Sequence, residues 1–341
     1  MEHKPKILLI LTGGTICSQE NPNGKRYSNA RDIKITEDFH NGNSPYANKV
    51  DFDKAMPLDI LSENMTVESW NTLLTELKNT DFSLYKGIII LHGTDTLAYT
   101  SAMLSMMLGG LCVPVIMVSA QLPLSHKNTN GHQNFRTAVE LILNGIQPNV
   151  YAVYKNSDKK IYLHQGAHLE QCKNFSDDFF SRSRKNISDP AIACMYGREF
   201  EKNTQYLDKI SSFSDSVLLI TPYVGINYDR FSLEGVKAVI HTTFHSESVC
   251  VGDKLPLPHS VLSLIDRCKE RDIPLFLAPC SFDAYKYEST GEALKYGAYY
   301  IESTTLEAAY AKVMVAVALG LDKEQMRVFV NESVNWETIN V

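Results

Sequence analysis

The sequence predicts an α/β protein made of two domains, and three observations support this prediction. Short β-rich apolar runs alternate with helical patterns along the chain, which is typical of parallel strands covered by helices. The 341 residues, 44% of them hydrophobic, suffice for about two domains that each bury a core. A polar stretch without strong apolar runs interrupts the pattern at about residues 181–215. We therefore expect an N-terminal domain over 1–190, a linker over 191–214 and a C-terminal domain over 215–341.

Seven apolar runs are the predicted strands. Four of them precede the polar stretch and three follow it. In chain order they are Ile7 to Leu11, Gly87 to Leu91, Val113 to Val118, Val150 to Tyr154, Val217 to Thr221, Val236 to Ile240 and Ile273 to Ala278.

Two segments carry clear helix signals. Leu97 to Leu108 is a predicted helix that ends at a Gly-Gly pair. The second helix, Thr304 to Leu319, opens with a capping box of Thr304 and Glu307 and is followed by glycine. By contrast, Gln19 to Asp32 lacks hydrophobic periodicity, so we expect a mobile loop beside the end of the first strand.

Charge and cysteine usage exclude several classes of protein. Lys and Arg total 33 against 39 Asp and Glu, a net charge of -6, so no large basic surface is available and we expect no nucleic-acid partner. The seven cysteines are odd in number and never form a CxxC pair, which argues against a disulfide framework and a structural zinc site. We expect reduced thiols.

No targeting or membrane-spanning segment is predicted. The N-terminal charges are followed by an apolar run of only five residues, too short for a signal-peptide core. No stretch approaches the ~20 apolar residues of a membrane span. We expect a soluble, cytoplasmic protein without a membrane partner.

Two predicted strands end in similar glycine- and threonine-rich loops, Thr12 to Ile16 and His92 to Thr96. Ligands bind at the carboxyl ends of parallel strands, where glycines permit close approach to the backbone and free N–H groups can hold an anion. The pair of loops therefore predicts one shared site. The alternative is that Thr94, Asp95 and Thr96 only cap the following helix.

Other common chemistries lack their motifs. The first loop has no third glycine at the GxGxxG spacing, and neither GxxxxGK[ST] nor GxSxG occurs, which argues against nucleotide binding and a serine hydrolase. Histidines four residues apart occur at His164 with His168 and at His241 with His245. The first pair encloses Gly166 and the second follows a predicted strand, so we expect no metal site.

Three ordered motifs resemble the bacterial-type L-asparaginases, most closely the cytoplasmic type I branch. They are TGGTI at Thr12 to Ile16, SENMT at Ser62 to Thr66 with Trp70, and HGTDT at His92 to Thr96. The resemblance implies a larger N-terminal α/β domain with a mostly parallel sheet and a left-handed crossover, and a smaller flavodoxin-like C-terminal domain. It also implies a homodimer or homotetramer, in which the C-terminal domain of one protomer closes the site of another.

The same resemblance implies catalytic residues. Thr15 would be the nucleophile, hydrogen-bonded to Tyr27, and Thr94 the second catalytic threonine beside Asp95. The family's lysine position falls on Gln171, which cannot take a proton. With a shift of the loop, Lys173 is the alternative occupant.

The substrate-binding residues implied are Gly14, Ser62, Glu63, Thr94 and Asp95, and no cofactor is implied. We expect an amidohydrolase that converts asparagine, or a related small amide, to the acid and ammonia. The alternative, motivated by Gln171, is a weakly active or inactive relative that binds an amino acid or small peptide as a sensor. A third alternative within the resemblance is the archaeal protein that acts on charged transfer RNA. We rank it last, because acidic residues outnumber basic ones and give no RNA-binding surface.

Overall fold

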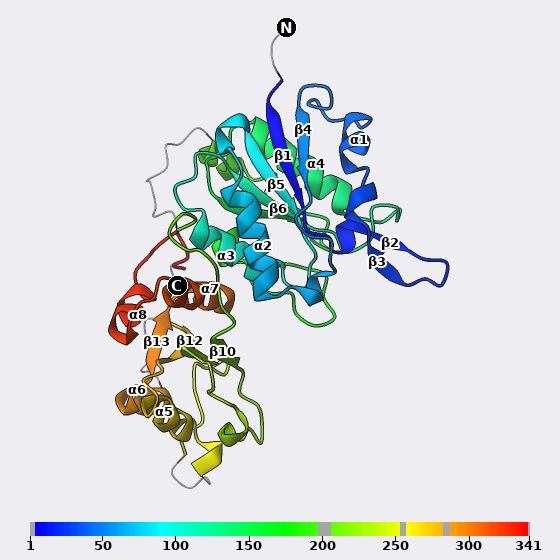
Figure 1. Ribbon diagram of the computed structural model, residues 1–341. Helices are drawn as coiled ribbons and strands as arrows, with labels where there is room; N and C mark the ends of the chain where they lie inside the picture. The colour runs from blue at the N-terminus through cyan, green and yellow to red at the C-terminus, as the bar shows by residue number, and fades with distance from the viewer. Residues whose placement is uncertain (1–3, 197–205, 253–256, 282–286, 340–341) are drawn as a thin grey trace. The chain divides into compact units, whose positions relative to one another are not determined.

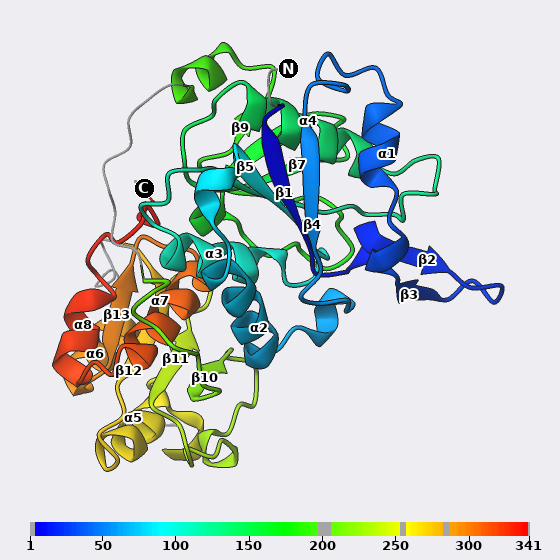
Figure 2. The ribbon, with the colours of Figure 1, turned by 45° about the horizontal axis from the view of Figure 1, so that its top comes forward.

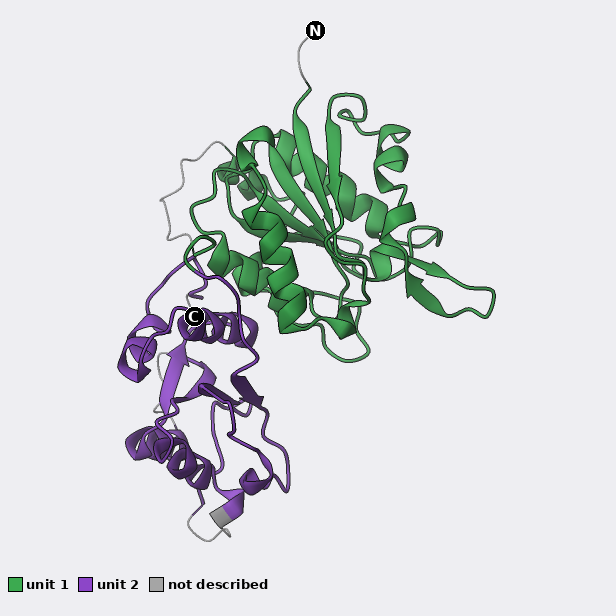
Figure 3. Cartoon of the chain, in the orientation of Figure 1, with its two compact units in different colours: residues 1–209 green, residues 210–341 purple. Residues whose placement is uncertain are grey.

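The computed structural model describes residues 4–196, 206–252, 257–281 and 287–339. The chain forms two compact units, residues 1–209 and 210–341 (Figure 3). The boundary between them falls inside the predicted linker, but the first part of that linker belongs to the first unit. A 3-10 helix covers Pro190–Met195, and Ile192 is buried in the first unit's core.

The first unit is built on a seven-stranded sheet whose first five strands in spatial order are parallel and whose last two pair antiparallel (Figure 1). In spatial order the strands are β4 (Asp51–Ala55), β1 (Lys6–Leu11), β5 (Gly87–Leu91), β6 (Val115–Val118), β7 (Val150–Lys155), β8 (Ile161–Gln165) and β9 (Lys185–Asn186).

Helices cover both faces of this sheet (Figure 2). On one face, α4 contacts β5, β6 and β7, and its Phe135 joins Leu9, Leu91 and Val118 in the core. On the other face, α3 contacts β7 and is buried nearly all round, consistent with its continuous apolar sequence. The helices are α1 (Ile35–His40), α2 (Val67–Lys78), α3 (Leu97–Met107) and α4 (Gly131–Leu143).

The segment expected to be a mobile loop is instead a β-hairpin. Strands β2 (Ser18–Glu20) and β3 (Arg26–Ser28) pair antiparallel and project from the body of the unit (Figure 2). The Asn21 side chain accepts hydrogen bonds from the N–H groups of Asn23 and Lys25, and Gly24 has φ +72°. This turn chemistry closes the hairpin without any hydrophobic pattern in the strands.

The second unit is a four-stranded parallel sheet with helices on both faces. Its strands, in spatial and chain order, are β10 (Val217–Ile220), β11 (Ala238–Thr242), β12 (Leu275–Cys280) and β13 (Tyr299–Glu302). Helix α7 contacts the first three strands, whereas α5 and α6 pack together against the other face. The helices are α5 (Val261–Lys269), α6 (Glu288–Tyr296), α7 (Leu306–Ala318) and α8 (Lys323–Phe329).

The expected α/β fold class and all seven predicted strands are confirmed, whereas the start of the last predicted helix is wrong by one residue. The N-cap of α7 is Thr305, whose side chain accepts from the N–H of Ala308, so the capping box of Thr304 and Glu307 does not form. Short 3-10 helices lie at Thr15–Cys17, Ala30–Asp32, Ser62–Asn64, Phe82–Leu84, Gly166–His168, Pro190–Met195, Tyr228–Arg230 and Leu257–His259.

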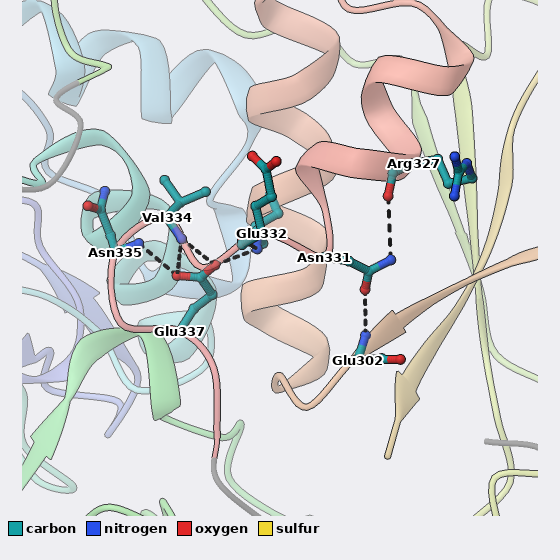
Figure 4. A network of polar contacts seen from close by, with 8 residues as sticks. Glu302, Arg327, Asn331, Glu332, Val334, Asn335 and Glu337 are labelled. Atoms are coloured by element: carbon teal, nitrogen blue, oxygen red, sulfur yellow. Dashed lines mark hydrogen bonds and ion pairs between the residues drawn. The ribbon is translucent and has the colours of Figure 1, made fainter. Parts of the chain in front are cut away.

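A buried ion pair joins α7 to the C-terminal segment of the second unit (Figure 4). The Lys312 ammonium contacts the Glu337 carboxylate and donates to the carbonyl of Glu332. Glu337 also accepts from the N–H groups of Val334 and Asn335, at 3.0 and 2.8 Å. Burial lowers the pKa of Lys312, so its charge depends on this carboxylate.

Candidate active site

The two glycine- and threonine-rich loops meet backbone to backbone. A Cβ atom placed on Gly14 would lie 2.2 Å from the Cα of Gly93, and one placed on Gly93 would lie 2.3 Å from the hydroxyl of Ser62. Because each threonine follows its glycine directly, the Cα atoms of Thr15 and Thr94 lie within about 11 Å of each other. The structure therefore brings three segments together at one place, at the carboxyl ends of β1 and β5.

The loop after β1 is fixed by backbone contacts on both sides. The N–H and hydroxyl of Thr12 both donate to the carbonyl of Leu91, at 3.1 and 2.8 Å. The Gly14 N–H donates to the carbonyl of Ile60 at 2.7 Å. Gly13 and Gly14 have φ of +103° and +77°, a conformation that L side chains rarely adopt. Glycine is required here by conformation as well as by space.

Thr15 and Thr94 both present free polar groups. Each side chain is half-buried. Within the described residues, neither the hydroxyl nor the N–H of either threonine has a hydrogen-bond partner. Two hydroxyls and two backbone donors are therefore available to a ligand in this part of the unit.

Ser62 links its own segment to the loop after β5. Its buried hydroxyl accepts from the N–H of Asp95 at 3.1 Å and donates to the Asp95 carboxylate at 3.3 Å. Thr96 is the N-cap residue of α3, but its hydroxyl donates to the carbonyl of Ser62 rather than accepting from the helix. The helix-capping alternative is therefore wrong for Thr96. Glu63 is exposed in the same 3-10 turn as Ser62.

Gln171 reaches the candidate site. Its side-chain amide donates to the backbone carbonyl of Asp95, whereas Lys173 is exposed. Between them, Cys172 is half-buried, and burial together with nearby carboxylates, Asp95 among them, raises the pKa of its thiol to about 12. In this structure a neutral amide, not an ammonium, contacts the Asp95 backbone.

The expected hydrogen bond between Tyr27 and Thr15 is not formed. The Tyr27 hydroxyl donates to Gln19 at 3.2 Å, because these residues lie opposite each other in the hairpin, and its side chain is 45% exposed. The base of the hairpin is anchored nearby through Ser28, which donates to Asp59 at 2.5 Å. A role for Tyr27 remains a prediction.

The spaced histidines pair with hydroxyl groups. His164 and His168 lie 2.9 and 2.7 Å from the hydroxyls of Ser181 and Ser183, and His241 lies on β11 beside a tyrosine hydroxyl. No cluster of three or more His, Cys, Asp or Glu side chains suited to a metal occurs among the described residues. Likewise, no helix among the described residues has the length and apolar character needed to cross a bilayer.

Sequence reasoning assigned no role to two residues at the loops: His92, the first residue of the second loop, and Asp59. His92 is fully buried, and its Nδ1 lies 2.8 Å from the carbonyl of Gly93. Burial lowers the pKa of His92 to about 4. The carboxylate of Asp59 accepts from Ser28 and from the N–H of Ala30. No periodic pattern marks either residue. Asp59 depends on contacts with a distant segment, whereas His92 forms one hydrogen bond to the residue that follows it.

Together these features define an α/β protein with a candidate site of hydroxyl groups and free backbone donors at the carboxyl ends of two parallel strands. A family model described as "Asparaginase, N-terminal" matches residues 6–205. The chain belongs to the asparaginase family of amidohydrolases.

Both L-asparaginases and a subunit of a tRNA-dependent amidotransferase align with nearly the whole chain. An L-asparaginase of Thermococcus kodakarensis is 27% identical over 350 residues, covering 97% of this chain and 98% of that protein. A glutamyl-tRNA(Gln) amidotransferase subunit of Pyrococcus horikoshii is 24% identical, covering 95% of this chain and 75% of that protein. The crystal structure of L-asparaginase I from Vibrio cholerae superposes with a TM-score of 0.74 at 21% identity, covering 99% and 100% of the two chains, and shows the shared fold.

Proposed function

We propose that this protein hydrolyses the side-chain amide of L-asparagine, or of a closely related small amide, with Thr15 as nucleophile. The observation that carries this proposal is the packing of Gly14 against Gly93, which puts Thr15 and Thr94 in one place with free hydroxyl and N–H groups. A threonine hydroxyl and nearby oxyanion donors are the groups that acyl transfer requires.

In the proposed reaction, the Thr15 oxygen forms a bond to the amide carbon. The free N–H groups of Thr15 and Thr94 stabilise the oxyanion, and the C–N bond then breaks to release ammonia. The hydroxyl proton passes to the leaving nitrogen, with Thr94 and the phenol of Tyr27 as candidate relays. Water then cleaves the acyl-enzyme to aspartate and frees Thr15.

The charged groups at the site suit an amino-acid substrate. The carboxylates of Asp95 and Glu63 are both exposed and match an α-ammonium group. The Ser62 hydroxyl is held beside Asp95 by two hydrogen bonds, and buried Gly14 directly precedes the free N–H of Thr15, which can face a substrate carboxylate. We assign these four groups, with Thr94, to substrate binding.

Gln171 supports a second candidate function, that of an amino-acid or small-peptide sensor with little or no activity. Its amide contacts the Asp95 carbonyl but cannot accept or relay a proton. The similarity to a glutamyl-tRNA(Gln) amidotransferase shows that relatives carrying another name align with most of this chain.

We further propose a homodimer or homotetramer in the cytoplasm. The described residues that meet at the site all come from the first unit, and Asp95 is exposed to solvent there. We propose that a neighbouring protomer covers this exposed side of the site. A structural relative is described as a probable cytoplasmic L-asparaginase.

The test is to measure ammonia release by the purified full-length protein from asparagine, glutamine and small peptides with a terminal asparagine. Isothermal titration calorimetry measures the binding of the same compounds. Hydrolysis of one or more amides supports the proposal. Saturable binding without ammonia release would overturn it in favour of the sensor, and a protein that neither binds nor hydrolyses them would overturn both.

A further inference from the structure

His92 connects the buried face of the sheet to the loop after β5. It follows β5 directly and is fully buried, with Nδ1 2.8 Å from the carbonyl of Gly93. Because a carbonyl oxygen can only accept, Nδ1 must carry the proton. The lowered pKa leaves the ring neutral at physiological pH, so Nε2 carries a lone pair.

The ring belongs to a row of polar residues at equivalent positions on four adjacent parallel strands. Thr12, His92 and Ser119 directly follow β1, β5 and β6, and Tyr154 within β7 continues the same register. All four residues are buried. They share one face of the sheet, opposite the face that packs against α4. Within the described residues, Nε2 of His92 and the hydroxyl of Ser119 have no hydrogen-bond partner. In this row, His92 is the residue whose side chain hydrogen-bonds to the backbone of the loop after β5, at the carbonyl of Gly93.

That bond determines which way the next peptide faces. The peptide between Gly93 and Thr94 is planar, so its carbonyl and its N–H point in opposite directions in the usual trans form. With the carbonyl held toward the buried imidazole, the Thr94 N–H points away from it. This N–H has no acceptor among the described residues, and Thr94 is half-buried at the site.

Gly93 cannot hold this orientation by itself. It has no side chain and is required to be small, because Gly14 and Ser62 occupy the space a Cβ would need. Glycine also has the widest backbone freedom of any residue. Among the described residues, the imidazole is the group that hydrogen-bonds to the 93–94 peptide, and it thereby adds to the packing of Gly93 against Gly14 and Ser62.

We propose that His92 is a positioning residue for amide hydrolysis, which holds the Gly93 carbonyl so that the Thr94 N–H faces the developing oxyanion. This inference rests on the proposed function and adds to it a residue that does not touch the substrate.

The experiment compares kcat and KM for asparagine, or for the best amide of the panel, in four variants. His92→Asn retains an amide N–H at the place of Nδ1, whereas His92→Gln moves it one bond further out. His92→Phe retains a ring without a donor. Ser119→Ala is the matched control, since Ser119 is equally buried in the same row but its hydroxyl bonds to neither loop.

Removal of one oxyanion donor typically costs about 100- to 1000-fold in kcat. We expect His92→Phe and His92→Gln to lower kcat by about 30- to 300-fold with KM within about threefold, because orientation is lost rather than the donor itself. His92→Asn and Ser119→Ala should stay within about fivefold of wild type. If His92→Phe fails to fold, the comparison of kcat between His92→Asn and His92→Gln tests the inference.

Wild-type kcat in His92→Phe, or Gln equal to or better than Asn, would overturn the inference alone. An equal loss in Ser119→Ala would also overturn it, because any disturbance of the polar row would then suffice. The absence of ammonia release by the wild-type protein would overturn the proposed function and this inference with it.

Discussion

The packing of Gly14 against Gly93 can be tested with two matched glycine substitutions. Gly14 and Gly145 have nearly the same backbone φ, +77° and +78°. Their surroundings differ. A Cβ at Gly14 would lie 2.2 Å from the Cα of Gly93, whereas a Cβ at Gly145 would meet nothing within 4 Å. Gly145→Ala therefore measures the cost of a Cβ at positive φ without a collision, and Gly14→Ala adds the collision.

The size of each effect follows from these distances. A Cβ in the left-handed conformation costs about 1–2 kcal/mol. Gly14, with φ +77° and ψ -175°, lies in a region that is essentially restricted to glycine, where the cost is of order 1–3 kcal/mol. An ordinary contact begins at 3.4 Å, so Gly14→Ala must separate the two loops by roughly 1 Å or more. Overpacking of this kind costs about 1–3 kcal/mol more, and a 1 Å displacement of reacting groups costs about 100-fold in rate.

We therefore expect Gly14→Ala to lose at least about 100-fold in kcat/KM, and Gly145→Ala to keep wild-type activity. The assays are coupled ammonia release and unfolding in urea, which measures the free energy of unfolding of each variant. Activity of Gly14→Ala within threefold of Gly145→Ala would refute the reasoning that the two loops form one site.

Three further changes test other parts of the structure. Lys312→Met should lower the free energy of unfolding by about 3–5 kcal/mol, because it leaves the Glu337 carboxylate buried and unpaired, and urea unfolding should show a much smaller loss when Glu337→Leu is added. Gln171→Lys should raise turnover and Lys173→Ala should change it little, and steady-state kinetics showing the reverse would mean that Lys173 serves the site. Burial lowers the pKa of His164 to about 3, so the unfolded chain binds the proton first and stability falls as pH drops from about 6.5 toward 3. His164→Asn should reduce this slope by about 1.4 kcal/mol per pH unit in denaturant titrations, and an unchanged slope would contradict the assignment.

The sequence predicts the strands that are continuous apolar runs, including the edge strand β10, but not the more polar strands β4, β8, β9 and β13. The central strands are continuous apolar runs because both of their faces are covered. Strand β4, with the sequence DFDKA, lies at a sheet edge and is half exposed, so it lacks such a run. Strands β9 and β13 are also edge strands with partly exposed residues. Their strand structure depends on a neighbour that is distant in sequence, which no local pattern reveals.

The candidate site could also be predicted from the sequence only in part. The loops bearing Thr15 and Thr94 could be predicted, because both follow apolar runs and contain glycine. The contact between Gln171 and the Asp95 carbonyl required the resemblance to a family to suggest it and the fold to display it. His92 stands in the predicted loop, but its role could not be predicted from sequence, since it depends on one hydrogen bond to the residue that follows it.

The central claim is that Thr15 is the nucleophile of an amide hydrolysis. The most direct measurement compares ammonia release from asparagine by the wild-type protein, Thr15→Ser and Thr15→Ala. The serine variant retains a hydroxyl and should keep measurable turnover, whereas the alanine variant should lose at least about 1000-fold in kcat while remaining folded. Turnover by Thr15→Ala within tenfold of wild type would contradict the assignment of Thr15.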